Sequence, residues 1–158
     1  MSEIDGKSRV VTVTPVLSLT AYADGDQMGS VLTLENMFDT SGDTLALQTL
    51  AVLDKSKQNS SIDILFFKSS PTVASVDNAP LDISDAEMAA KFVGKLSLLN
   101  TSYSDLANSS IANINNLGIL CQSVGGGITS LYCILQCRGT PTYTSASDLV
   151  LNIGAFQD

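Results

Sequence analysis

The residues that could do chemistry in this chain are carboxylates, cysteines and a run of glycines, because its 158 residues include no histidine. Without imidazole the chain cannot build a Ser-His-Asp triad, a Cys-His pair or a mixed Cys/His zinc site. Two carboxylates in a cleft, about 5 to 10 Å apart, could still hydrolyse a glycoside. No motif singles out such a pair, so we predict no catalytic residue and no enzymatic activity.

Carboxylates gather most densely between positions 77 and 87, at Asp77, Asp82, Asp85 and Glu87. Oxygen ligands of this kind suit a hard cation such as calcium. The spacing does not match a calcium-binding loop, and acids at 85 and 87 are explained more simply as first-turn residues of a helix. Asp24 and Asp26 flank a glycine, which is typical of a turn. We predict no metal site and no cofactor.

The glycine run 125–127 lies within SVGGGITS and lacks the spacing and the lysine of a phosphate-binding loop. We expect a tight hairpin turn there. Cys133 and Cys137 fall in one expected strand, about 13 Å apart, and so cannot pair with each other. With Cys121 they are expected to be buried small hydrophobes, made in a reducing cytoplasm.

The charge balance excludes whole classes of partner. Sixteen acidic side chains against eight basic ones give a net charge of −8. Nucleic-acid binding needs clustered positive charge, and an anionic membrane surface would repel this chain. The first fifteen residues show no signal peptide, and no stretch reaches the ~20 apolar residues of a membrane span. We therefore predict neither nucleic acid nor membrane as a partner.

The elements that must position these residues are mostly strands. Apolar and polar residues alternate in eight segments separated by turn-forming residues, at 9–19, 31–38, 44–54, 62–67, 93–99, 114–124, 129–138 and 149–156. No helix lies between successive strands to make parallel crossovers. We predict an all-β fold, an antiparallel β-sandwich of jelly-roll type, as a single domain over 9–158. Segments 44–54 and 62–67 are expected to form a hairpin, with Ile62, Ile64 and Phe66 as the buried stripe.

One helix interrupts this pattern. Ser84 followed by Glu87 is a capping box, which predicts a short helix near 85–92. The preceding stretch 69–81 contains two prolines and several turn formers, so we expect it to run irregularly over the surface.

Two further features bear on binding. Tyr103 and Tyr143 lie in polar connections, where they could stack on a sugar or pack half-buried against the domain. From residue 101 onward only four charged side chains occur in 58 residues. Depletion of charge is typical of a buried interface, although serine, threonine and asparagine can also solvate a sheet face. We expect the charged surface to face solvent and this C-terminal third to face other subunits.

Four stretches, at 52–67, 71–87, 115–120 and 135–151, resemble in pattern and order a group of small structural proteins of tailed bacteriophages, of the capsid decoration or cement type. This resemblance implies a β-rich homotrimer on the capsid surface that binds the major capsid protein and holds the shell against internal DNA pressure. Synthesis in the host cytoplasm and a location in the virion follow. The cysteines in two late strands depart from the group's pattern.

The polar opening MSEIDGKS, residues 1–8, is interpreted as an N-terminal arm that orders on the shell, with Ile4, Lys7 and Arg9 as contacts. Fraying is the commoner fate of such a terminus. A different hypothesis, from the same fold, is a carbohydrate-binding or adhesion module of a phage tail or fibre.

Overall fold

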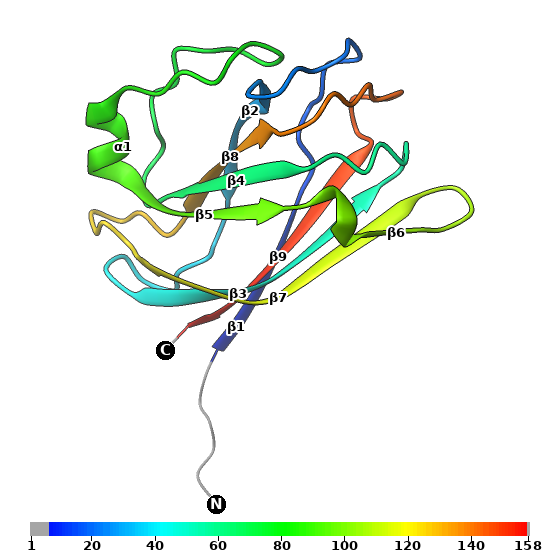
Figure 1. Ribbon diagram of the computed structural model, residues 1–158. Coiled ribbons are helices and arrows are strands. Elements are labelled where there is room, and N and C mark those ends of the chain that lie inside the picture. The colour runs from blue at the N-terminus through cyan, green and yellow to red at the C-terminus, as the bar shows by residue number, and fades with distance from the viewer. Residues whose placement is uncertain (1–6, 158) are drawn as a thin grey trace, which may run out of the picture.

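The chain folds into two antiparallel sheets packed face to face, seen in the computed structural model, which describes residues 7–157 (Figure 1). The first sheet has the order β1-β9-β3-β7-β6, made of β1 Lys7–Val13, β9 Leu149–Gln157, β3 Thr44–Asp54, β7 Ser110–Gln122 and β6 Tyr103–Asp105. The second has the order β2-β8-β4-β5, made of β2 Gln27–Leu34, β8 Leu131–Cys137, β4 Ile62–Phe67 and β5 Phe92–Leu98.

Consecutive strands mostly alternate between the two sheets, and every pairing is antiparallel. The strands from β1 to β4 change sheet at each connection, and β7, β8 and β9 do so again. This is the jelly-roll topology, which confirms the predicted fold class.

The main core lies between the sheets, where alternation along each strand places one face inward. On β3 the inward residues Leu45, Leu47, Leu50 and Val52 are all buried. A second, smaller core lies on the outer face of the β2-β8-β4-β5 sheet, where residues of the 73–88 segment cover Leu65, Phe67 and Ile134. All six residues of β4 are therefore buried, whereas the sequence predicted a single buried stripe.

The predicted hairpin between 44–54 and 62–67 is wrong, because β3 and β4 belong to different sheets. Asp54 is fully buried, and its carboxylate accepts the backbone N–H groups of Ser56 (3.0 Å) and Asn59 (2.9 Å). These bonds hold a corner that carries the chain across the sandwich. The glycines at 125–127 likewise connect β7 to β8 in the other sheet and do not close a hairpin, although all three have positive φ as a sharp bend requires.

Two early strands are displaced from their predicted limits. β1 ends at Val13, before Pro15, and pairs with β9 alone, as expected for an edge strand. β2 begins at Gln27, ahead of the predicted start at position 31, because Gly29 at φ 73° and a bulge between Met28 and Leu32 let the strand continue.

The predicted helix forms as α1, Asp85–Lys91, which is followed by β5 and a single 3₁₀ turn, Asn100–Ser102. Ser84 caps it by accepting the Glu87 N–H at 3.3 Å. The Glu87 carboxylate does not accept the backbone N–H of Ser84. It binds Lys91 Nζ (2.6 Å) and the Thr72 N–H (2.7 Å), and it thereby links the helix to the start of the segment that covers the second sheet. Among residues 7–157, no helix is long and apolar enough to cross a membrane.

Candidate interaction surface

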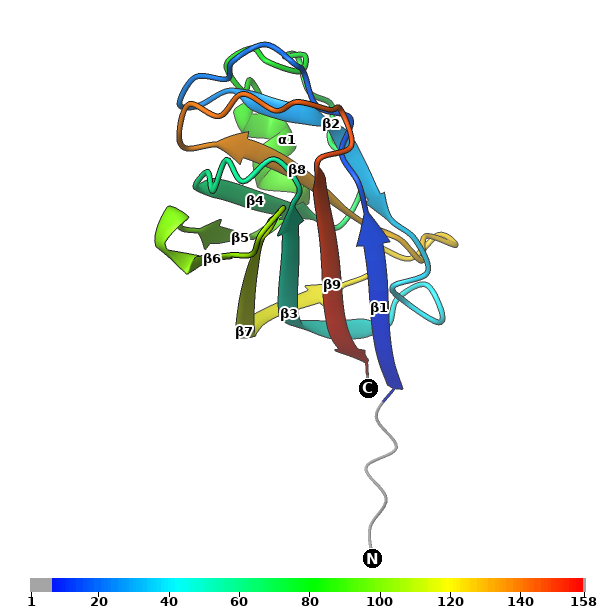
Figure 2. The same ribbon diagram turned by 90° about the vertical axis from the view of Figure 1, so that its right-hand side faces the viewer.

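The outer face of the β1-β9-β3-β7-β6 sheet is a broad surface with no covering element (Figure 2). Strand alternation and register place its outward residues opposite the buried positions of the main core. We call this surface the open face; its members are Ser8, Val10, Thr12, Thr44, Ala46, Thr49, Ala51, Leu53, Ser104, Ile111, Asn113, Asn115, Leu120, Gln122, Val150, Asn152, Gly154 and Phe156. None of these described residues is charged.

Register arranges most of the open face as four rows that cross the strands. Two end rows are largely apolar: Ser8, Phe156, Ala46 and Leu120 at one end, and Val150, Leu53, Ile111 and Ser104 at the other. The two middle rows are rich in amides and hydroxyls: Val10, Gly154, Thr49 and Asn115, then Thr12, Asn152, Ala51 and Asn113.

Several apolar side chains of the open face are left in solvent. Leu120 is 77% exposed, Val10 75%, Phe156 58% and Ile111 44%. Single exposed hydrophobics are ordinary, but four on one uncharged sheet face are typical of an interaction surface. A shallow hollow of about 460 Å³ lies at one end of the face and is lined in part by Ile111, Asn113 and Asn152.

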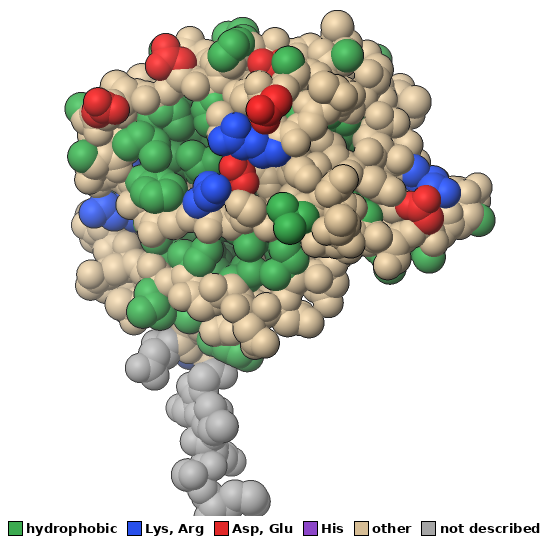
Figure 3. Space-filling view, viewed as in Figure 1, with side chains coloured by type: hydrophobic (Ala, Val, Ile, Leu, Met, Phe, Trp, Pro, Cys, Tyr) green, Lys and Arg blue, Asp and Glu red, His purple; other side chains and the backbone are tan. Residues whose placement is uncertain are grey.

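The opposite side of the molecule carries charge (Figure 3). Asp63 on β4 is 5% exposed and accepts hydrogen bonds from Ser97 Oγ (2.6 Å), Arg138 Nε (2.9 Å) and Lys95 Nζ (3.3 Å). Burial by itself raises the pKa of Asp63, but these donors outweigh it and hold the pKa below its ordinary value. Arg138 also lies 3.5 Å from Asp24. The sequence did not predict this cluster, because its members come from β4, β5 and two loops that are far apart in the sequence.

The predicted shell contacts do not gather on the open face. Ile4 lies outside the described residues. Lys7 and Arg9 both belong to β1 and both form ion pairs with Asp39, Lys7 Nζ at 2.5 Å. Their role in binding a shell stays a prediction.

Neither tyrosine offers a sugar platform. Tyr143 is 2% exposed and packs edge-on against Tyr22, with ring centroids 6.2 Å apart. Tyr103 is half-buried against the main core and donates a hydrogen bond to the Ser60 carbonyl at 3.0 Å. Burial raises the pKa of both phenols, so they stay protonated at physiological pH.

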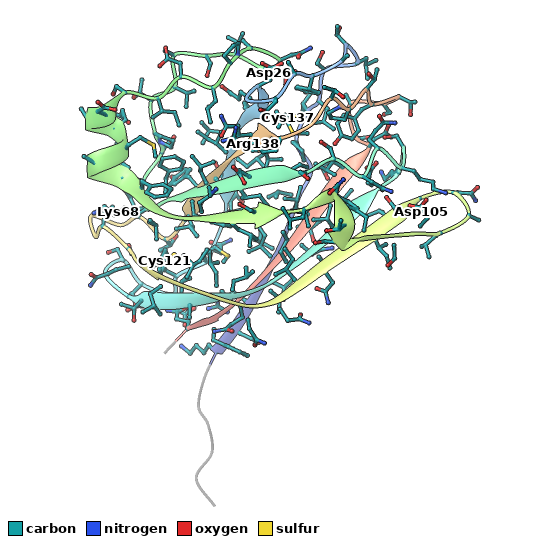
Figure 4. The ribbon with its side chains drawn as sticks, viewed as in Figure 1. Asp26, Lys68, Asp105, Cys121, Cys137 and Arg138 are labelled. Carbon is teal, nitrogen blue, oxygen red and sulfur yellow. The ribbon has the colours of Figure 1, made fainter. Side chains whose placement is uncertain are left out.

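The three cysteines are buried and free, as predicted, and Figure 4 labels two of them, Cys121 and Cys137. Burial raises the pKa of Cys121 and of Cys133 to about 12, so neither provides a thiolate at neutral pH. Cys121 belongs to β7 and Cys137 to β8, on different sheets.

Two of the four acids between 77 and 87 bind groups within the fold. Asp77 accepts the Tyr22 hydroxyl and the Gly29 N–H, both at 2.6 Å, and Glu87 binds Lys91. Asp26 accepts the Ala23 N–H at 2.8 Å in a loop, the turn role expected of it. Within residues 7–157 no group of three or more potential ligands is placed to hold a metal ion.

The charge-poor C-terminal third has two locations in the fold. β8 is an inner strand of the second sheet, and the covering segment buries its outer side, including Ile134. β7 and β9 contribute half of the open face, where amides and hydroxyls meet solvent beside the apolar residues. Burial within the chain therefore accounts for one part of the depletion, and the uncharged open face accounts for another.

No protein family model matches the chain, and no curated protein matches it. Among solved structures, it is similar to a chain of the Israeli acute paralysis virus full particle heated to 63 degrees, at 13% identity over 97% of this chain and 67% of that chain, with a TM-score of 0.31. It is also similar to a chain of the native virion of Kashmir bee virus at neutral pH, at 12% identity over 96% and 68%, with a TM-score of 0.27. At these low scores the likeness carries no functional argument, and the fold rests on the chain's own strand order.

Proposed function

We propose that this protein is a non-enzymatic structural component of a virion that decorates and stabilises a capsid. The observation that carries the proposal is the open face: a whole sheet of a jelly roll that presents apolar and neutral polar groups to solvent and no charge. Such a surface is suited to packing against protein. The sequence resemblance to phage decoration proteins supports the same role.

Stabilisation would come from repetition. Each copy makes a modest contact, and the symmetry of a shell repeats that contact many times. Many weak contacts together can then hold the assembly tightly, although no single interface is strong. In this proposal the partners are the major capsid protein and other copies of the chain. The protein is made in the host cytoplasm and resides on the capsid surface.

The number of copies per particle tests the proposal. Quantitative mass spectrometry of purified virions from the virus whose genome encodes the chain should give hundreds of copies. A handful of copies would indicate a tail or fibre part, and absence from the virion would overturn the proposal.

The N-terminal arm belongs to the same proposal, with Ile4 as its apolar contact and with Lys7 and Arg9 at its base. Deleting residues 1–8 should lower the occupancy of preformed shells. Because the deletion removes Lys7 and Ser8 from β1, a second variant, Ile4→Ser, tests the arm while leaving that strand whole, and it should lower occupancy as well. Undiminished occupancy in both variants would remove the arm from the mechanism.

A carbohydrate-binding or adhesion module is the alternative function. The observation that favours it is the hollow of the open face, whose asparagine and serine side chains could hydrogen-bond sugar hydroxyls. The hollow has no aromatic platform among its lining residues. Binding on a glycan array that is lost with Asn113→Ala would favour this alternative.

A further inference from the structure

We infer that one partner of the open face is a second copy of this chain, placed with its own open face against the first. The inference deepens the proposed function, on which it rests for the role of the assembly, by naming that partner and the surface used. Three properties of the open face support it: its neutrality, the chemistry of its polar groups and the order of its rows.

Two copies of an acidic chain associate most readily through a surface that carries no charge. Two copies with a net charge of −8 each repel one another wherever their acids approach within roughly the 8 to 10 Å screening length of physiological salt. A basic partner would be recognised best through the chain's acids, yet the described acids all lie off the open face. The open face therefore offers no electrostatic attraction to a basic partner, and it adds no electrostatic repulsion toward a second copy of the chain.

The polar groups of the open face can pair with their own kind. Asparagine and glutamine amides carry both donors and acceptors, and threonine hydroxyls do as well. Asn113, Asn115, Asn152, Thr12 and Thr49 occupy the two middle rows. A patch of carboxylates or ammonium groups could not complement a copy of itself, whereas a two-fold contact requires the patch to do so.

The rows have the order that a two-fold contact needs. An axis parallel to the strands brings each row onto its own copy. An axis across the strands exchanges the two end rows, and both of these are apolar. In either arrangement the end rows, which hold Phe156, Leu120, Leu53 and Ile111, meet end rows that are largely apolar, and the amide rows meet amide rows.

A charge placed near the centre of the open face tests the pairing. Asn152 stands in a middle row on an inner strand, and its side-chain oxygen accepts a hydrogen bond from Thr12, which a carboxylate also accepts. Asn152→Asp is therefore nearly isosteric and brings two like charges together only if two open faces meet. Asn108→Asp makes the same change in the loop between β6 and β7, off the open face, and is the matched control.

The measurement is the mass of the full chain in solution by light scattering. We expect the wild type and Asn108→Asp to have twice the 16.6 kDa mass of one chain. Asn152→Asp and Asn152→Lys, each measured alone, should have the mass of one chain. An equimolar mixture of the two Asn152 variants should regain the double mass, which a folding defect could not produce.

A wild type that stays monomeric at its highest soluble concentration would overturn the inference, as would an assembly that Asn152→Asp leaves intact. A trimer, which is the state that the resemblance to decoration proteins implies, would also overturn it, because a ring of three closes through two different surfaces. That result would leave the proposed function standing, since the copy number per virion tests it separately.

Discussion

The outer faces of the two sheets differ in what covers them. On the β2-β8-β4-β5 sheet, α1 and the segment before it bury Leu65, Phe67 and Ile134, and an ion cluster surrounds Asp63. On the other sheet, nothing in the described chain covers Val10, Leu120 or Phe156. The β2-β8-β4-β5 sheet completes its burial within one chain, whereas the β1-β9-β3-β7-β6 sheet leaves its outer face exposed. The covered face contributes to the stability of the chain, and the open face is the surface that we propose for association.

The largest effect should come from removing a phenylalanine from the covered face. Phe67→Ala should destabilise the chain by about 3–5 kcal/mol, because Phe67 is fully buried and leaves a cavity. Phe156→Ala, on the open face, should cost less than about 1 kcal/mol in a dilute monomer. Urea unfolding of both variants measures the difference, and equal losses would contradict the division between the faces.

The ion cluster on the covered side should matter next. Asp63→Asn leaves Lys95 and Arg138 without their carboxylate, and we expect a loss of about 1–2 kcal/mol, below the figure for a fully buried pair because both cations are partly exposed. Asp105→Asn removes an exposed pair with Lys57 at 3.6 Å and should cost under about 0.5 kcal/mol. A smaller loss for Asp63→Asn than for Asp105→Asn would be the contrary result.

The same carboxylate should contribute to acid sensitivity. Hydrogen bonds hold the folded-state pKa of Asp63 below its ordinary value, so its contribution is present above about pH 4 and is lost as pH falls through the lowered value. The free energy of unfolding should therefore fall on acidification, and it should fall less steeply in Asp63→Asn. Parallel pH profiles for the two proteins would rule out this role of Asp63.

A smaller effect should appear on the open face at Gly154. A Cβ added there would clash with the Thr49 hydroxyl, which covers the glycine. Gly154→Ala should cost about 1 kcal/mol in the wild type, because the β-branched threonine has little freedom to move. The cost should vanish in a Thr49→Ala background. A cost that persists in that background would place the strain elsewhere.

Much of the fold could be predicted from the sequence, and for local reasons. Period-two alternation identified eight of the nine described strands and missed only the short β6, which lies in a stretch expected to be a polar connection. Ser84 before Glu87 located α1, because a cap is set by neighbours in the chain. The pairing of β3 and β4 was predicted wrongly. A polar turn has the same sequence pattern whether it closes a hairpin or carries the chain to the other sheet. Here the turn leads to the other sheet, and the Asp54 carboxylate stabilises it by accepting two backbone N–H groups.

The site was harder to predict than the fold. Charge depletion after residue 101 pointed toward an interface, but it could not separate β8, covered within the chain, from β7 and β9 on the open face. Rows across strands depend on register, and the contributions of β1 and β3 to the open face become visible only once register is known. The Asp63 cluster joins residues far apart in sequence, and no local pattern marks it.

The central claim, that the open face becomes covered when the protein assembles, has a direct test in thiol labelling. Asn115→Cys places an accessible thiol on this face, while the native cysteines are buried. Val76→Cys, at a position 69% exposed and off the open face, is the control. We predict that labelling at position 115 slows severalfold as the protein is concentrated or bound to shells, while labelling at position 76 does not. Equal labelling rates at position 115 in the dilute, concentrated and shell-bound protein would contradict the claim.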